Sequence, residues 1–64
     1  MSIFEMRLII DNIERFGGYR EQEVLKNLVK IELIMDTKDY KVYHFEDIEG
    51  NYFEYDLKSH RITN

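Results

Sequence analysis

The chain has 64 residues, of which 44% are hydrophobic and 34% are charged, and it lacks cysteine, proline and tryptophan. That balance is typical of one small globular domain spanning residues 1–64, and it excludes disulfides, cysteine-ligated zinc and thiol catalysis. The formal net charge of −4 argues against a protein that neutralises nucleic-acid phosphates. We therefore expect a domain that is stabilised by packing alone and needs no cofactor.

The N-terminal segment Met1–Glu5 has no basic start, which argues against a secretory signal. Acidic residues interrupt each apolar run well before the length of about eighteen residues that marks a membrane helix. These features predict a cytoplasmic protein that does not contact membranes.

Ser2 and Glu5 have the spacing of a capping box, in which the two side chains satisfy free amides at the start of a helix. Apolar residues then recur at helical intervals, at Ile3, Met6, Ile10 and Ile13, before Gly17-Gly18 ends the run. We expect a helix over about residues 3–16. The alternation of Phe4, Met6, Leu8 and Ile10 leaves a strand as the competing interpretation.

Good helix formers around a short apolar face predict a second helix over about residues 20–28. From Val29 the apolar residues recur every second position, which favours a strand over residues 29–35, although the end of a long helix also fits. Loops at residues 36–39 and 47–50 and a tight return at Lys58-Ser59 then predict strands over about 40–46, 51–57 and 60–63. The expected fold class is α+β, with one or two N-terminal helices packed on one face of a four-stranded antiparallel meander.

The predicted loops determine which residues of neighbouring strands lie opposite one another. They place Val42 between Leu33 and Tyr55, His44 between Ile31 and Phe53, and Ile62 opposite Tyr55. Both hairpins then turn the same side of residues 40–46 toward the apolar face, which supports the pairing. The expected inner face consists of Val29, Ile31, Leu33, Met35, Tyr40, Val42, His44, Phe53, Tyr55, Leu57 and Ile62.

The same pairing places three aromatic side chains, Tyr43, Phe45 and Tyr52, on the outer face of the sheet. Monomers tend to avoid such exposed patches, so the patch indicates an interface. Ordinary cross-strand aromatic pairs are the alternative explanation.

Sites for metals and catalysis find little support. Residues 47–51 resemble a calcium loop only loosely, because the glycine stands fourth instead of sixth and Lys58 occupies the twelfth position. A hairpin turn with positive φ at Gly50 or Asn51 explains the segment better. The spacing of His44 and His60 fits no compact zinc motif, and no serine or threonine lies in a nucleophile motif. We expect neither a metal site nor an enzyme.

Five carboxylates and no lysine or arginine lie between Lys41 and Lys58. We interpret the chain as a small acidic protein-binding module, an inhibitor or regulator of a basic or nucleic-acid-handling protein. By analogy of size and charge alone, it would be of phage or mobile-element type. The predicted partner-binding residues are Tyr43, Phe45, Glu46, Asp47, Glu49, Tyr52, Glu54 and Asp56.

Three alternatives stay open. The aromatic face pairs with itself in a structural homodimer, or its rings stack on single-stranded nucleic acid. In the third alternative the carboxylates serve only to keep a small protein soluble.

Overall fold

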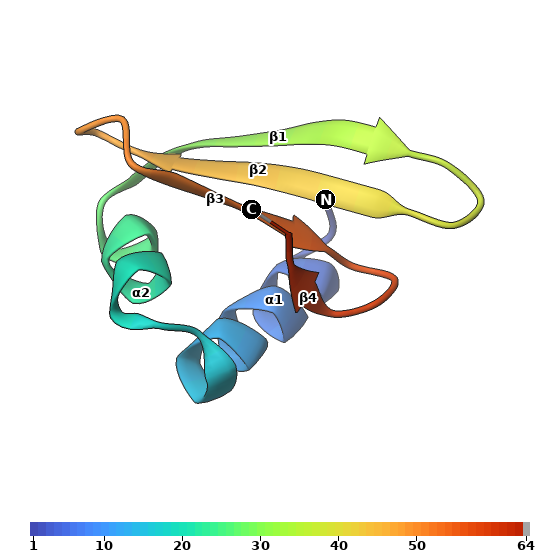
Figure 1. Cartoon of the computed structure of the whole chain (residues 1–64), viewed down its shortest axis with the longest axis horizontal. Helices are drawn as coiled ribbons and strands as arrows, with labels where there is room; N and C mark the ends of the chain where they lie inside the picture. The colour runs from blue at the N-terminus through green and yellow to red at the C-terminus, as the bar shows by residue number, and fades with distance from the viewer. Residues whose placement is uncertain (64) are drawn as a thin grey trace.

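The structure is a computed structural model that describes residues 1–63. Two helices precede four strands: α1 (Ile3–Phe16), α2 (Tyr19–Lys26), β1 (Leu28–Asp36), β2 (Lys41–Asp47), β3 (Tyr52–Asp56) and β4 (Arg61–Ile62). The strands form one antiparallel sheet in the order β1-β2-β3-β4, and both helices lie on the same side of it (Figure 1). The predicted α+β meander is therefore confirmed.

Helix α1 begins and ends where the sequence predicts. The Ser2 hydroxyl accepts a hydrogen bond from the Glu5 amide at 3.0 Å, and the Glu5 carboxylate accepts one from the Ser2 amide at 3.1 Å. At the other end the Gly17 amide donates to the Ile13 carbonyl oxygen, and a Cβ on Gly17 would lie only 2.5 Å from that oxygen. This close approach explains why glycine occupies the helix end. Within residues 1–63 neither helix has the length and apolar character needed to cross a membrane.

The buried stripe of α1 differs from the predicted one. Ile9 and Ile13 are buried, whereas Ile3, which we expected on the stripe, is 81% exposed. Met6, Ile9 and Ile13 are spaced by three and four residues, so they obey the helical rule as well as the predicted set does. The segment has enough apolar residues for two overlapping stripes, and packing selects between them.

The core lies between the helices and the inner face of the sheet. Phe45 of β2 and Phe53 of β3 stack with their ring centroids 4.8 Å apart. Buried side chains surround this pair from both helices and both central strands: Ile9, Ile13, Val24, Tyr43 and Tyr55. The aromatic rings of β2 and β3 therefore form the centre of the fold.

The predicted pairing of β2 is wrong by one residue on both sides. Phe45 lies opposite Ile31 and Phe53, and Tyr43 lies opposite Leu33 and Tyr55. A shift of one residue turns every side chain of a strand to the other face. Val42 and His44 therefore belong to the outer face. The predicted pairing of Tyr55 with Ile62 is confirmed.

Three further residues of the expected inner face lie elsewhere. Val29 is exposed at the first of two irregularities in the pairing of β1 with β2. The second irregularity lies at Ile34, and beyond it Met35 pairs with Val42 on the outer face. Tyr40 is exposed in the turn before β2, where its carbonyl accepts a hydrogen bond from the Thr37 amide. The extra residue at each irregularity breaks the two-residue period that the prediction assumed.

Candidate functional site

Two of the predicted partner-binding residues are core residues. Tyr43 is 4% exposed and Phe45 is fully buried, so the predicted aromatic patch on the outer face is wrong. Burying their large rings removes more apolar surface from water than burying Val42 and His44 would. Of the three predicted aromatics, only Tyr52 lies at the outer surface.

Asp47 stabilises the turn between β2 and β3. Its Oδ1 accepts hydrogen bonds from the Glu49 and Asn51 amides, both at 2.9 Å. The Asp47 amide donates to the Asn51 carbonyl, and Gly50 adopts a positive φ of 84°. The Asp47 side chain is buried and has a structural role in this turn, while Glu49 lies exposed at its tip.

Asp56 has the same role at the end of β3. Its Oδ1 accepts from the Lys41 and Lys58 amides, each at 3.1 Å, and its Oδ2 accepts from the Ser59 hydroxyl at 2.9 Å. Burial opposes ionisation of this carboxyl, but the hydrogen bonds outweigh it and lower its pKa below the usual 3.8. Asp56 therefore holds β2, β3 and the following turn together.

The remaining predicted residues meet around His44 at the centre of the outer face. The His44 Nε2 lies 2.9 Å from Glu46 Oε1, and its Nδ1 lies 3.2 Å from Glu54 Oε2. The Tyr52 ring stacks on the imidazole at a centroid distance of 5.0 Å, and the Arg20 guanidinium lies 5.7 Å from the centre of the Tyr52 ring. We call His44, Glu46, Tyr52 and Glu54 the histidine cluster.

The two carboxylates favour the protonated imidazole. Hydrogen bonding to Glu46 raises the pKa of His44 above the usual 6.5, burial partly opposes the rise, and hydrogen bonding to Glu54 adds to it. With both nitrogens protonated, His44 donates to both carboxylates. Glu32 of β1 lies opposite His44, but its carboxylate pairs with the Lys30 ammonium at 3.3 Å. Two carboxylates, Glu46 and Glu54, therefore share the imidazolium, and together with it they carry a net negative charge.

A shallow apolar hollow adjoins the histidine cluster on the same face. Met35 and Ile34 of β1 are about half exposed, and Val42 of β2 is buried beneath them. The hollow is lined by Ile34, Met35, Tyr40, Val42, Glu54 and Thr63. Glu54 belongs to both the hollow and the histidine cluster, so apolar and acidic surfaces meet at this residue.

The side chains of the histidine cluster contact one another. Among residues 1–63 no group of three histidine, cysteine, aspartate or glutamate side chains is placed to hold a metal ion. The His44 nitrogens both face carboxylates instead of a serine or threonine hydroxyl, so no activated nucleophile is formed at this face.

The residues that the sequence analysis missed are His44, assigned to the core, and the apolar side chains of the hollow. One local signal could have found His44. An aspartate often accepts hydrogen bonds from amides two or more residues later at the start of a turn. Taking Asp47 in that role shortens the predicted loop by one residue, which turns His44 outward and Phe45 inward.

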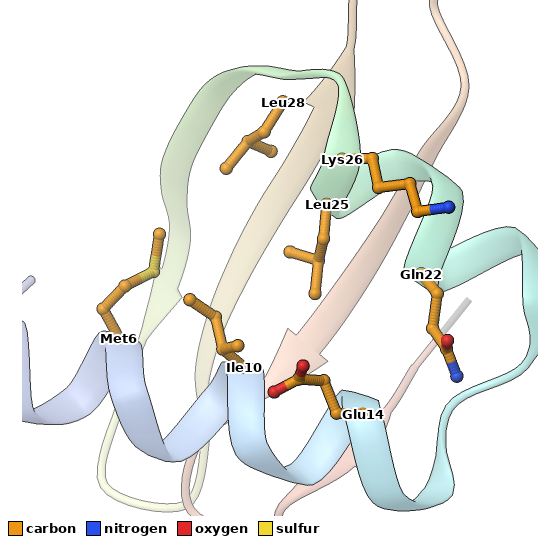
Figure 2. A pocket seen from close by; sticks show the side chains of 7 residues that line it. All are labelled: Met6, Ile10, Glu14, Gln22, Leu25, Lys26 and Leu28. Atoms are coloured by element: carbon orange, nitrogen blue, oxygen red, sulfur yellow. The ribbon is translucent and has the colours of Figure 1, made fainter.

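A second depression lies on the helix side of the molecule. It separates α1 from α2 beside the start of β1, and its floor consists of Met6, Ile10, Leu25 and Leu28 (Figure 2). Glu14, Gln22 and Lys26 form its polar rim. None of these residues was predicted as a site, and they contribute an apolar surface next to β1.

The chain was compared with protein-family models, with the sequences of curated proteins and with solved structures, and none of the three comparisons gave a match. Inference about function therefore starts from the chain's own surfaces. The outer face of the sheet, with its apolar hollow beside the histidine cluster, is the candidate functional site.

Proposed function

We propose that this protein is a small binding module, an inhibitor or regulator, that holds a basic segment of a partner protein on the outer face of its sheet. The supporting observation is the contact between the apolar hollow and the histidine cluster through Glu54. Protein interfaces commonly combine an apolar anchor with a polar rim, and this face has both on a small area.

The hollow would receive one apolar side chain of the partner. Ile34 and Met35 leave roughly half of their surface in water, and Val42 provides an apolar floor between them and Glu54. Burying one large apolar side chain contributes about 1.5–3 kcal/mol, before the cost of ordering both surfaces. The hollow therefore supplies affinity for one anchor residue.

The carboxylates would select the residues on either side of that anchor. Glu32 and Glu54 lie in one row across the sheet on either side of His44, and Glu46 lies two residues further along β2. Protonated His44 offsets one of the two negative charges of Glu46 and Glu54, and Lys30 pairs with Glu32. A lysine or arginine on the partner would be attracted to these carboxylates, mainly increasing the rate of association at low salt. The preferred partner thus carries an apolar residue beside basic ones.

Binding of single-stranded nucleic acid receives less support from this face. A stacking platform needs several exposed rings in a basic surround. Tyr52 is the one predicted ring at the surface, its ring already stacks on His44, and Glu46 and Glu54 lie beside it. The Arg20 guanidinium lies 5.7 Å from the centre of this ring, but the two carboxylates beside it would repel phosphates.

The test is affinity capture from a cell lysate with the tagged protein and four variants, each quantified by mass spectrometry. Met35→Asp and Glu54→Lys alter the hollow and its acidic edge. Phe16→Asp and Glu14→Lys make the same changes on exposed or rim positions of α1, on the other side of the molecule. We expect a partner that both control variants retain and that M35D and E54K lose by about tenfold or more.

The salt dependence of capture completes the test. Raising the salt concentration should weaken capture by the wild type, because surface charges are screened within about 8 Å at physiological ionic strength. Equal recovery of the same proteins by M35D, E54K and the wild type would contradict the proposal. Recovery that is insensitive to salt would contradict its electrostatic part.

A further inference from the structure

Strand β1 is a free edge of the sheet. It pairs with β2 on one side, and its other side pairs with no strand among residues 1–63 (Figure 1). The strand is nine residues long and leaves large apolar side chains exposed, namely Val29, Ile31, Leu33, Ile34 and Met35. A long apolar edge offers unpaired backbone groups to another strand.

The inner face of β1 is only partly covered by the helices. Ile31 and Leu33 lie opposite the buried Phe45 and Tyr43, yet they remain 38% and 44% exposed. The depression between α1 and α2 adjoins the start of β1, with Leu25 and Leu28 in its floor (Figure 2). The apolar inner surface therefore continues to the open edge of the sheet.

The outer face of β1 carries two opposite charges. Lys30 and Glu32 are two residues apart, and the Lys30 Nζ lies 3.3 Å from the Glu32 carboxylate. Both side chains are about half exposed. A strand with one positive and one negative residue on the same face is complementary to an antiparallel copy of itself in one particular alignment.

We propose that the β1 edge pairs with the β1 edge of a second copy of this chain, with the two-fold axis at Ile31. The rules of antiparallel pairing limit how two copies of β1 can align. Residues directly opposite each other in an antiparallel pair have their side chains on the same face of the sheet. A two-fold axis perpendicular to the sheet must therefore lie midway between the two copies of one residue. Between the irregularities at Val29 and Ile34, only axes at Ile31 or Glu32 preserve three regular residue pairs.

Charge selects between these two alignments. An axis at Glu32 sets the two Glu32 side chains directly opposite each other, which is destabilising. An axis at Ile31 sets each Lys30 opposite the Glu32 of the other copy, and it brings the two Ile31 side chains together on the inner face. The alignment at Ile31 therefore gives favourable charge pairs on the outer face and an apolar contact on the inner face.

Such pairing closes at two copies. Each chain has one long free edge, since β4 at the other edge has only two residues. A two-fold pairing of identical edges uses that long edge in both chains. The dimer would join two sheets into one and place two outer faces side by side, which goes beyond the proposed function and does not depend on it.

Single cysteine variants test the alignment, because the natural chain contains no cysteine. Directly opposite residues bring their Cβ atoms to about 4.5–5.5 Å, close enough for a disulfide after a small shift. In a glutathione redox buffer, Ile31→Cys should form a covalent dimer at least about tenfold faster than Glu32→Cys or Leu33→Cys. Faster cross-linking of E32C or L33C than of I31C would overturn the alignment.

Exposed charge variants test the association without touching the apolar core. In sedimentation across a dilution series, Lys30→Glu and Glu32→Lys should each raise the dimer dissociation constant by about tenfold, since each places like charges opposite each other twice. The double variant K30E/E32K restores opposite charges and should dimerise like the wild type. An equimolar mixture of K30E and E32K should form a heterodimer for the same reason.

The outcomes decide the proposal. A wild-type protein that stays monomeric up to millimolar concentration overturns it. A dimer whose stability is unchanged in both K30E and E32K also overturns it, because the proposed edge would not be in contact. Loss of dimer in the single variants, together with its return in the mixture, supports the edge and its alignment.

Discussion

The two faces of β2 have different surroundings, although each face carries at least one apolar residue. The inner side chains, Tyr43 and Phe45, are covered by α1 and α2 and by the aromatic rings of β3. The outer side chains, Val42, His44 and Glu46, lie opposite residues of β1 and β3 on the face that points away from the helices (Figure 1). The inner face therefore carries stability, whereas the outer face carries the charges and the hollow available to a partner.

This division shows that burial follows the amount of apolar surface and not only its alternation. Residues 41–47 read Lys-Val-Tyr-His-Phe-Glu-Asp, so each face has one clearly apolar position at least. Two aromatic rings bury far more apolar area than a valine and an imidazole. Because Tyr43 and Phe45 point inward, His44 points outward, where the Glu46 and Glu54 carboxylates can pair with its charge.

The largest predicted difference between the two faces of the sheet comes from removing one aromatic ring from each. Phe45→Ala should destabilise the protein by about 3–5 kcal/mol, because Phe45 is fully buried and stacked on Phe53. Tyr52→Ala, the matched change on the outer face, should cost about 1 kcal/mol or less. Urea unfolding monitored by circular dichroism measures both. If F45A were no more costly than Y52A, the described orientation of β2 would be wrong.

A smaller effect is expected from the carboxylate that joins β2 to the turn after β3. The pKa of Asp56 is lowered, because hydrogen bonds from the Lys41 and Lys58 amides and the Ser59 hydroxyl outweigh the opposing effect of burial. Its contribution to stability is therefore complete above the usual pKa of 3.8 and is lost as the pH falls through the lower value of the folded state.

Acid titration of stability tests this contribution. Asp56→Asn should be less stable than the wild type at neutral pH and should lose less stability than the wild type below pH 3.8. Asp11→Asn, a matched change on the exposed surface of α1, should leave the acid profile nearly unchanged. Parallel profiles for D56N and the wild type would show that the Asp56 hydrogen bonds contribute nothing to acid stability.

The turn that sets the pairing of β2 with β3 should be moderately sensitive. Gly50 has a φ of 84°, and a Cβ there would meet no atom within 4 Å, so the whole cost of Gly50→Ala comes from the backbone. We expect a loss of about 1 kcal/mol in the free energy of unfolding. Gly50→Asn should cost less, because asparagine tolerates this conformation. Equal costs for both variants would contradict this explanation.

The same turn explains how far prediction from the sequence could go. The helix cap at Ser2, the helix end at Gly17 and the four-stranded meander have signals in the sequence, and the structure confirms them. The positive φ predicted at Gly50 or Asn51 occurs at Gly50. The length of the turn has a weaker signal. The predicted loop includes Asp47, whereas in the structure Asp47 ends β2 and accepts hydrogen bonds from the turn amides.

The agreement between the two predicted hairpins could not reveal that error. Moving β2 by one residue against both neighbours preserves the agreement and leaves the inward residues of β1 and β3 unchanged. Phe53, Tyr55 and Ile62 were accordingly predicted on the correct face, while Val42 and His44 were predicted on the wrong one. The incorrect prediction of an aromatic patch on the outer face has the same cause, the one-residue error in the pairing of β2.

The candidate site was therefore predicted only in part. Tyr52 and Glu54 lie on the outer face as predicted, whereas Glu46 joins them because the one-residue shift of β2 turns it outward together with His44. The hollow depends on the irregularity at Ile34, which brings Met35 onto the same face as Val42. Such an extra residue has no clear mark in a strand of consecutive apolar residues.

The smallest predicted effect concerns the charge at the centre of the outer face. Hydrogen bonding to Glu46, and then to Glu54, raises the pKa of His44 above 6.5, although burial opposes the rise. The stability that protonated His44 supplies is therefore complete below pH 6.5 and is lost as the pH rises through the raised pKa. We expect less than about 1 kcal/mol, because Glu46 and Glu54 are partly exposed.

Replacing each of the two histidines in turn isolates the stability that protonated His44 supplies. His44→Gln should abolish the loss of stability that accompanies a rise in pH above 6.5, whereas His60→Gln, which leaves the histidine cluster intact, should retain it. Urea unfolding over a series of pH values below and above 6.5 measures the difference, and the imidazole resonances in an NMR titration should assign a pKa above 6.5 to His44. A His44 that titrates below 6.5 would mean that burial outweighs the two carboxylates. In that case the outer face would carry its full acidic charge at neutral pH, and the contrast with the inner face would be larger than described.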